Sequence, residues 1–211
     1  MPRGLFLSFE GGDGSGKSTQ AKLLAQWLQD QGYEVVLTRE PGGTELGQEI
    51  RQLLLHGGHV APRAEALLYA ADRSQHVETK ILPALQRGAV VITDRYLDSS
   101  LAYQGVARDL GSEQILALSQ WATGGLLPKR TILLDVDAQT AATRLGPDRD
   151  RLEAAGTAFH QAVRQEFLAL AAAAPERFLV LDAALPKQEI FTAVLSEIKL
   201  LLPPAPAKEQ P

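Results

Sequence analysis

The feature that most constrains the fold is a glycine-rich stretch near the start of the chain. Residues 11–18 read GGDGSGKS and fit the pattern G-x-x-x-x-G-K-[ST]. The apolar run before it, 5–9, is typical of a buried strand, and apolar residues recur at helical spacing over 21–28. In such a strand, loop and helix, the backbone N–H groups can surround a polyphosphate, Lys17 can reach its outer phosphates, and the Ser18 hydroxyl can bind Mg²⁺. The stretch therefore predicts an ATP-binding loop made of Gly11, Gly12, Asp13, Gly14, Ser15, Gly16, Lys17, Ser18 and Thr19.

Length and charge limit the classes of protein that this chain can be. Its 211 residues suffice for one α/β domain, so we expect a domain over 1–202 and a disordered, Pro-rich tail over 203–211. A formal net charge of −4 provides no overall basic field for nucleic acid or a membrane surface. Without Cys, disulfides and thiolate metal sites are excluded. We see no membrane-spanning run or signal peptide and expect a cytoplasmic protein.

Short apolar runs alternate with helical segments, which is typical of a parallel sheet covered by helices. Continuous apolarity predicts strands that are buried on both faces. We therefore expect an α/β fold of the P-loop type, with a five-stranded parallel sheet flanked by helices. The predicted strands are 5–9, 35–38, 90–93, 132–136 and 178–181, and the clearest helices are 46–55, 112–122, 157–174 and 187–201.

Charged residues follow the predicted strands at the edge where parallel sheets bind ligands. Arg39 follows the second strand in a glycine-rich turn, and Asp94 and Arg95 follow the third. Asp94 can hold the water shell of Mg²⁺, while Arg95 can form a forked contact with a second phosphate. Alternatively, Asp94 and Arg95 pair with each other and only fasten the strand end. Asp135 and Asp137, after the fourth strand, are rival candidates for the metal.

Two further segments carry the residue types of a second pocket. Tyr69 and Arg73 are four residues apart and can project from one face of a helix. Ser100, Tyr103 and Gln104 lie close together further along. A ring for stacking, an amide for a base edge and arginines for a phosphate would form a nucleoside monophosphate pocket. Taken singly, Tyr69 fits a core position equally well, and Gln104 fits an ordinary polar position on a helix.

Together these patterns resemble the thymidylate kinase family over residues 5–182. The resemblance implies ATP-dependent phosphorylation of dTMP to dTDP on the nucleoside monophosphate kinase fold, with Mg²⁺ and usually in a homodimer. The combination is far more specific than a P-loop alone. The matching segments are 9–11 (FEG), 38–44 (TREPGGT), 67–73 (LLYAADR), 94–96 (DRY), 99–105 (SSLAYQG) and 150–153 (DRLE).

The resemblance also implies how the second pocket would bind dTMP. Tyr69 would stack on thymine, and Arg73 and Gln104 would meet the polar edge of the base. Tyr103 would crowd the sugar where a ribose 2′-OH would sit, and Ser100 belongs to the same substrate-binding segment. The family usually has Phe at the stacking position, so the hydroxyl of Tyr69 needs a partner or water.

At the phosphates, the resemblance implies an arrangement of opposed charges. Arg39 and Arg95 would hold the phosphate of dTMP, and Asp13 would lie near the 3′-OH and the metal. Mg²⁺ would sit near the P-loop hydroxyl and Asp94, and Lys17 would stabilise the transferring group. Because the acceptor is already an anionic phosphate, no general base is required.

The P-loop has no Arg or Lys at positions 12–15, where some family members place a catalytic cation. The resemblance then indicates a lid, at about 144–153, that supplies arginine on closing. We expect Arg149 and Arg151 to be catalytic because they follow the Gly-Pro turn, and Arg144 to bind ATP near the adenine with the loop after residue 182. The alternative is an ordinary solvated loop.

Other classes of function fit only parts of the sequence. A P-loop kinase for another nucleoside monophosphate, a deoxynucleoside or a small alcohol shares the phosphate loop but would need a different second pocket. A guanine-reading switch protein needs an Asn-Lys-x-Asp element, which is excluded because the chain contains no Asn. A purely structural ATP-binding module would leave the second pocket unexplained.

Overall fold

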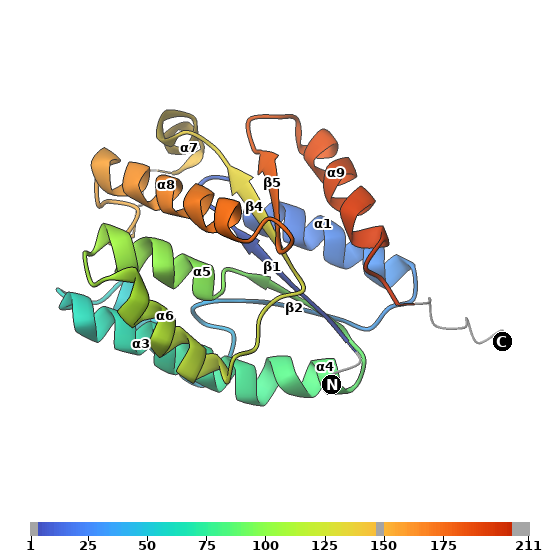
Figure 1. The fold of residues 1–211 in the computed structure, drawn as a ribbon, viewed down its shortest axis with the longest axis horizontal. Coiled ribbons are helices and arrows are strands. Elements are labelled where there is room, and N and C mark those ends of the chain that lie inside the picture. Colours follow the sequence, from blue (N-terminus) through green and yellow to red (C-terminus); the bar gives the residue numbers. More distant parts are fainter. Residues whose placement is uncertain (1–3, 147–149, 204–211) are drawn as a thin grey trace.

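A five-stranded, fully parallel sheet forms the centre of the molecule (Figure 1). The computed structural model describes residues 4–146 and 150–203, so the expected tail lies almost entirely outside it. The strand order is β2-β3-β1-β4-β5, and the predicted sheet is confirmed. The strands are β1 (Leu5–Glu10), β2 (Val35–Arg39), β3 (Val90–Asp94), β4 (Arg130–Asp135) and β5 (Phe178–Asp182).

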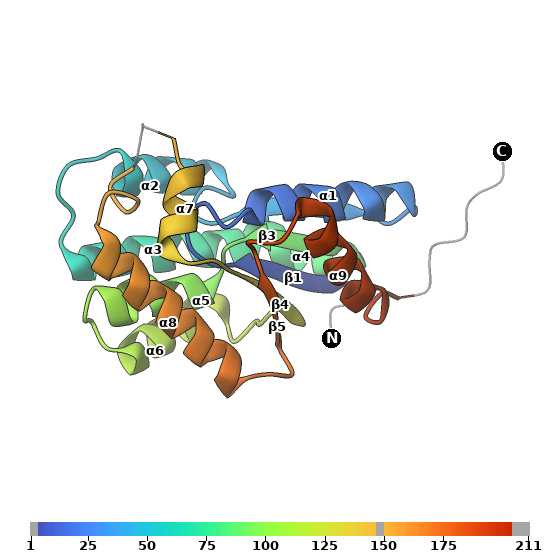
Figure 2. The ribbon, with the colours of Figure 1, turned by 90° about the horizontal axis from the view of Figure 1, so that it is seen from above.

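Helices cover both faces of this sheet. Figure 2 shows α1 and α9 on one side and α5, α6 and α8 on the other. The four clearest predicted helices are confirmed as α2, α6, α8 and α9, with small differences at their ends. The helices are α1 (Lys17–Asp30), α2 (Glu45–Leu55), α3 (Pro62–His76), α4 (Leu82–Gln86), α5 (Leu97–Ser100), α6 (Ser112–Thr123), α7 (Ala138–Arg144), α8 (Thr157–Ala173) and α9 (Lys187–Lys199), with π-helical segments η1 (Val77–Ile81) and η2 (Leu101–Ala107).

No helix in the described part of the chain is both long and apolar enough to span a membrane.

The core lies in two layers, one on each face of the sheet. Alternate residues of β1 face opposite sides. Leu7 and Phe9 pack in the cluster that contains α1 and α9, whereas Phe6 packs in the cluster that contains η1 and α4. All three side chains are buried. The central strands are therefore apolar on both faces, as their sequences predict.

The two edge strands differ from this pattern. In β2, Leu37 is 39% exposed, and in β5, Val180 is 45% exposed. Burial on both faces was therefore a wrong prediction for β2 and β5. Both strands have a neighbour on one side only, and the helices do not fully cover the outer edges of the sheet.

A buried pair of hydroxyl groups joins β1 to β4. Ser8 and Thr131 are opposite each other in the parallel register, and their hydroxyl oxygens are 2.9 Å apart. Arg177 also donates to the Thr131 hydroxyl, at 3.0 Å. Both hydroxyls are therefore satisfied, although both residues are inaccessible to solvent.

Candidate active site

A single cleft of about 840 Å³ contains both pockets expected from the sequence. Its lining combines P-loop residues with residues that follow β2 and β3 and with residues of α3 and η2. Three lysines and five arginines line it, against five carboxylates. Positive charge is thus concentrated locally although the chain carries a net −4. The lining includes Asp13, Gly14, Gly16, Lys17, Ser18, Thr19, Arg39, Tyr69, Arg73, Asp94, Arg95, Ser100, Tyr103, Gln104 and Arg144.

The P-loop turns directly from β1 into the first turn of α1. Gly16 is the residue before the helix and has a φ of 92°, a conformation that glycine adopts readily. No side chain caps this helix end. Its first N–H groups and the positive end of its dipole therefore remain for an anion. Gly11, Gly12 and Ser15, also expected in this loop, do not line the cleft.

Lys17 is held in place by the loop itself. Its Nζ donates to the carbonyl of Gly12 at 2.7 Å and to the hydroxyl of Ser15 at 3.4 Å. Burial, with the nearby charge of Arg95, lowers the pKa of Lys17 from 10.5 to about 8. The cation is therefore positioned but poorly solvated, and phosphate oxygens could replace its contacts with the loop.

Ser18 and Asp94 meet at the junction of α1 and β3. The Ser18 hydroxyl donates to Asp94 Oδ2, so the two oxygens proposed for a metal are adjacent. A hydroxyl and one carboxylate suit Mg²⁺, which keeps several water ligands and commonly binds substrate phosphates as well. Within the described residues, no cluster of three or more acidic or His side chains forms a metal site of protein ligands alone.

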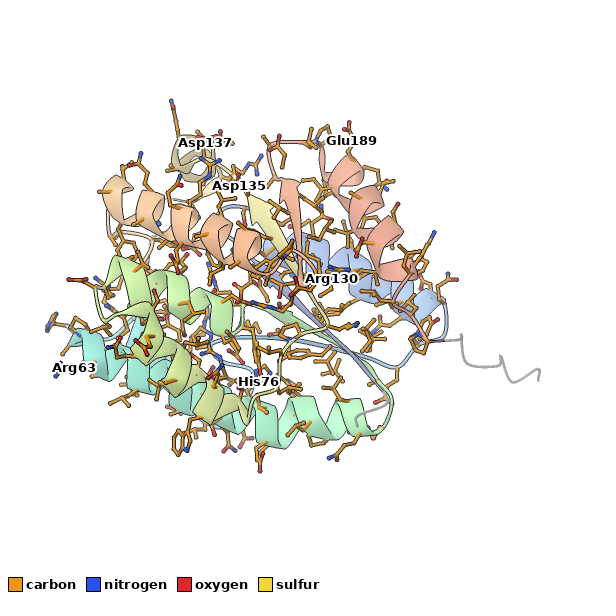
Figure 3. The ribbon with its side chains drawn as sticks, viewed as in Figure 1. Arg63, His76, Arg130, Asp135, Asp137 and Glu189 are labelled. Carbon is orange, nitrogen blue, oxygen red and sulfur yellow. The ribbon has the colours of Figure 1, made fainter. Side chains whose placement is uncertain are left out.

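The rival carboxylates, Asp135 and Asp137, have other structural partners (Figure 3). Arg164 forms a forked contact with Asp135, at 2.7 and 2.8 Å. Asp137 caps α7 by accepting from the backbone N–H groups of Gln139 and Thr140. Neither carboxylate lines the main cleft. The geometry thus favours Asp94 over both for the metal.

Arg95 joins the P-loop to the second pocket. Its Nη2 donates to Asp13 Oδ1 at 2.5 Å and to the Tyr103 hydroxyl at 3.2 Å, while that hydroxyl donates to Asp13 Oδ2 at 3.0 Å. Burial alone would raise the pKa of Asp13, but Arg95 and Lys17 lower it to about 2. Arg95 pairs with Asp13 and makes no ion pair with Asp94. The fastening role considered for the Asp94–Arg95 pair therefore does not describe this site.

The backbone of Arg95 is in a left-handed conformation, with a φ of 71°. Such a conformation is costly for a residue with a side chain. Three hydrogen bonds fix it. The Arg95 N–H donates to Phe9 O at 2.9 Å, Thr93 Oγ1 donates to Arg95 O at 2.8 Å, and the following N–H of Tyr96 donates to Glu10 Oε1 at 2.7 Å.

Glu10 also connects to the side chain of Arg95. Ser99 donates to Glu10 Oε2 at 2.6 Å and accepts from Arg95 Nη1 at 3.0 Å. Glu10 is inaccessible to solvent, and burial, with the nearby charge of Asp98, raises its pKa to about 8. The FEG motif includes this residue, but no sequence pattern indicates that it orients Arg95.

The second pocket lies between α3 and η2. Tyr69 and Arg73 both belong to α3, and both line the cleft, as their spacing predicts. Arg73 is 1% exposed and donates to Glu40, to Ser100 Oγ and to Tyr96 O. Within the described part of the chain, no protein group hydrogen-bonds the hydroxyl of Tyr69.

Glu40 anchors the TREPGGT loop to α3. Its carboxylate accepts from Arg73 Nε at 2.7 Å and contacts His76 Nδ1 at 2.9 Å. His76 Nε2 contacts Thr38 Oγ1 at 2.7 Å, and the N–H of Gly42 donates to Asp72 Oδ1 at 3.0 Å. This loop therefore carries Arg39 into the cleft on a backbone that α3 holds firmly.

The structure describes two of the three arginines expected in the lid. Arg144 lines the cleft and donates to Ala183 O at 2.9 Å, so it contacts the loop after residue 182 as expected. Arg149 lies outside the described residues. Arg151 does not line the cleft; it pairs with Glu65 at 2.6 Å and donates to Leu54 O at 2.9 Å. This arrangement does not bring Arg151 to the P-loop.

Three further cations, Lys22, Arg51 and Lys80, line the cleft and were not predicted from the sequence. Arg51 of α2 donates to Pro41 O at 2.9 Å, and Lys80 of η1 donates to Gly43 O at 2.8 Å. Burial and the proximity of Arg39 lower the pKa of Arg51. The position of Arg51 in the cleft could have been predicted, because Arg51 lies on α2, the helix that directly follows the TREPGGT loop.

The fold and the cleft together define a P-loop phosphotransferase of the nucleoside monophosphate kinase class, with an uncapped P-loop helix facing a second cationic pocket. Residues 9–194 match the family model described as thymidylate kinase. The chain belongs to the thymidylate kinase family, and the resemblance seen in its motifs is confirmed.

Individual relatives agree over nearly the whole chain. The thymidylate kinase of Clavibacter michiganensis subsp. michiganensis (strain NCPPB 382) is 60% identical over 203 residues, which cover 94% of this chain and 96% of the relative. That of Bifidobacterium longum (strain DJO10A) is 58% identical, with 94% and 98% covered. The crystal structure of thymidylate kinase from Ehrlichia chaffeensis is 32% identical, has a TM-score of 0.78, and covers 93% of this chain and 98% of that one.

Proposed function

We propose that this chain transfers the γ-phosphate of ATP to dTMP and so produces dTDP, with one substrate in each half of the cleft. Membership of the thymidylate kinase family supports this reaction over other acceptors. The structural observation that carries it is the continuity of the cleft, which joins the P-loop to the pocket between α3 and η2. The γ-phosphate of ATP and the phosphate of dTMP could then approach each other directly within one cleft.

In this proposal the donor and acceptor phosphates are aligned by opposed cations. The first turn of α1 and Lys17 hold the phosphates of ATP. Arg95, with Arg39, holds the phosphate of dTMP. The reaction needs alignment and neutralisation of negative charge, because the acceptor oxygen is already anionic. Asp13, which pairs with Arg95, would lie near the 3′-OH of dTMP.

Mg²⁺ is the proposed cofactor. Ser18 and Asp94 would hold it, and the contact between their oxygens in this structure supports the assignment. The ion, when bound, neutralises charge on the phosphate oxygens of the nucleotide. Asp13 is the other carboxylate proposed near the metal.

We assign the base-binding and lid roles by the same reasoning. Tyr69 would stack on thymine, Gln104 and Arg73 would bind its polar edge, and Tyr103 would exclude a 2′-hydroxyl. Their common location in the cleft supports these roles. For the lid over 144–153, Arg144 would contact ATP, and Arg149 and Arg151 would neutralise the transferring group after closing. Arg151 would have to leave Glu65 to do so.

The test of the proposed function is a panel of acceptors. Purified protein is incubated with ATP, Mg²⁺ and each of dTMP, dUMP, UMP, dGMP and thymidine, and ADP formation is followed. We expect dTMP to be the preferred acceptor by kcat/KM. Preference for another monophosphate, or for the nucleoside, would contradict the assignment. Omitting Mg²⁺ should abolish turnover.

We further propose that the protein works as a homodimer in the cytoplasm. Large apolar side chains exposed on α3 and α6 support an interface there, since Leu67 is 59% exposed and Trp121 is 82% exposed. Sedimentation velocity should then give the mass of two chains, and Trp121→Glu should shift it toward one. A single-chain mass for the unaltered protein would refute the dimer.

A further inference from the structure

Glu65 is a buried carboxylate to which the proposed reaction gives no role. It lies on α3, one helical turn before Tyr69, and is inaccessible to solvent. A carboxylate at such a position needs strong donors, because burying its charge unpaired would be very costly. Glu65 has three donors, and they come from different parts of the chain.

One donor is the amide of Gln104, whose Nε2 lies 2.9 Å from Glu65 Oε1. The others are guanidinium groups. Arg108 lies 3.4 Å from each Glu65 oxygen, and Arg151 lies 2.6 Å from Oε2. Guanidinium groups can only donate hydrogen bonds, so both Glu65 oxygens face donors. Glu65 therefore accepts hydrogen bonds from Gln104 and Arg108 and forms an ion pair with Arg151.

This chemistry fixes which way the Gln104 amide is turned. Since Glu65 Oε1 already accepts from the guanidinium of Arg108, the NH₂ of the Gln104 amide must face Glu65 and the amide oxygen must face away. Gln104 lines the cleft beside Tyr69 and Arg73. Within the described residues, Gln104 Oε1 has no hydrogen-bond donor from the protein. The amide thus offers its free oxygen to whatever occupies the pocket.

We propose that Glu65 is a positioning residue that sets the base specificity of the acceptor pocket by presenting Gln104 Oε1 as an acceptor. This inference rests on the proposed function. A pyrimidine with an N–H at position 3, such as thymine or uracil, donates to that oxygen. Cytosine carries a lone pair at position 3, which would face the oxygen unpaired and be rejected. Arg73, a donor only, complements the carbonyl at position 4 of the same bases.

The test is Glu65→Gln, which keeps the side-chain shape but can both donate and accept. The Gln104 amide can then turn and offer its NH₂ to the cleft. We expect the ratio of kcat/KM for dCMP to that for dTMP to rise at least about tenfold. The ratio of dUMP to dTMP should stay constant, because both bases carry the same N–H. An unchanged dCMP ratio in a folded variant, or an altered dUMP ratio, would overturn the proposal.

Two further variants separate this effect from general damage. Arg108→Gln removes a charge from Glu65 but leaves its contact with Gln104, so the dCMP to dTMP ratio should stay within about twofold. If Glu65→Gln does not fold, Gln104→Leu removes the acceptor oxygen directly, and undiminished discrimination against dCMP would then refute the inference. Failure of the unaltered protein to phosphorylate dTMP would instead refute the proposed function.

Discussion

Single residues in this site show how burial and neighbouring charges have opposing effects on a pKa. Lys17 is buried with few solvent contacts, and the pKa of its ammonium group is lowered to about 8. Arg95, which is half-buried, keeps its charge because a guanidinium loses its proton only at far higher pH, and Asp13 and Asp94 raise its pKa further. The lysine is therefore the cation of the cleft that titrates near neutral pH.

This difference predicts proton uptake when ATP binds. At pH 8 about half of the free Lys17 groups lack a proton, and adjacent phosphates raise the pKa so that the proton returns. Calorimetric titration of ATP in two buffers of different ionisation enthalpy should show net uptake of up to about half a proton at pH 8 and less at pH 7. Lys17→Arg keeps the charge without this titration, so it should lose the uptake. Equal uptake in both proteins would exclude Lys17 as the source.

A second prediction concerns the acceptor side alone. Arg95→Ala removes the proposed forked contact with the phosphate of dTMP, and KM for dTMP should rise roughly 10- to 100-fold. KM for ATP should change less than about threefold, because α1 and Lys17 remain. As a control, Arg87→Ala removes an exposed arginine paired with Glu34 and should change neither constant. Steady-state kinetics measure both KM values, and equal increases in KM for dTMP and for ATP would contradict the assignment.

At the scale of elements, α2 and α3 pack closely enough to require glycine at the start of α2. A Cβ atom at Gly47 would lie 2.3 Å from Asp72 Oδ1. That same oxygen accepts from the N–H of Gly42 in the TREPGGT loop. One side-chain oxygen of α3 therefore lies against both the start of α2 and the TREPGGT loop.

We predict that Gly47→Ala destabilises the protein by about 1–3 kcal/mol, because the added Cβ must either displace the buried Asp72 carboxylate from its hydrogen bond with Gly42 or push α2 away from α3. Gly58→Ala is the matched control. No atom of the described residues lies within 4 Å of a Cβ placed there, and the change should stay within about 0.5 kcal/mol. Urea unfolding measures both. Equal stabilities for the two variants would show that α2 can shift without cost.

Much of this arrangement of elements could be predicted from the sequence. Apolar runs and the P-loop predict the parallel sheet and its ligand-binding edge, and the four-residue spacing of Tyr69 and Arg73 predicts their common face. The pairing of Glu65 with Gln104 could not be predicted, since it joins residues 39 positions apart on different elements. The left-handed backbone of Arg95 was also hidden, because hydrogen bonds from distant residues impose it.

At the scale of the whole molecule, two buried acids make stability depend on pH. The pKa of Glu10 is raised to about 8 and that of Asp72 to about 6, in both cases first by burial. Between the ordinary pKa and the raised one, the native state holds a proton that the unfolded chain has released. Stability from these groups is therefore greatest at low pH and is lost as the pH rises through the raised pKa.

For Glu10 this loss falls between about pH 5 and pH 8. The free energy of unfolding should decrease by roughly 2 kcal/mol from pH 6 to pH 8 on account of this group. Glu10→Gln should remove most of that decrease. Glu34→Gln, at an exposed ion pair, should leave it in place. Urea unfolding at both pH values tests this, and identical slopes for the original protein and Glu10→Gln would exclude Glu10 as the cause.

The hydroxyl pair between Ser8 and Thr131 affects the register in which β1 and β4 pair. A slip of β4 by one residue along β1 would separate these oxygens and leave the Ser8 hydroxyl without its partner in a dry interior, at a cost of about 1–3 kcal/mol, whereas Thr131 would retain Arg177. Apolar side chains alone discriminate weakly between such slipped pairings, because Leu, Ile and Val resemble one another. Two small polar atoms thus specify the correct alignment, and with it the level at which the strands end beneath the nucleotide.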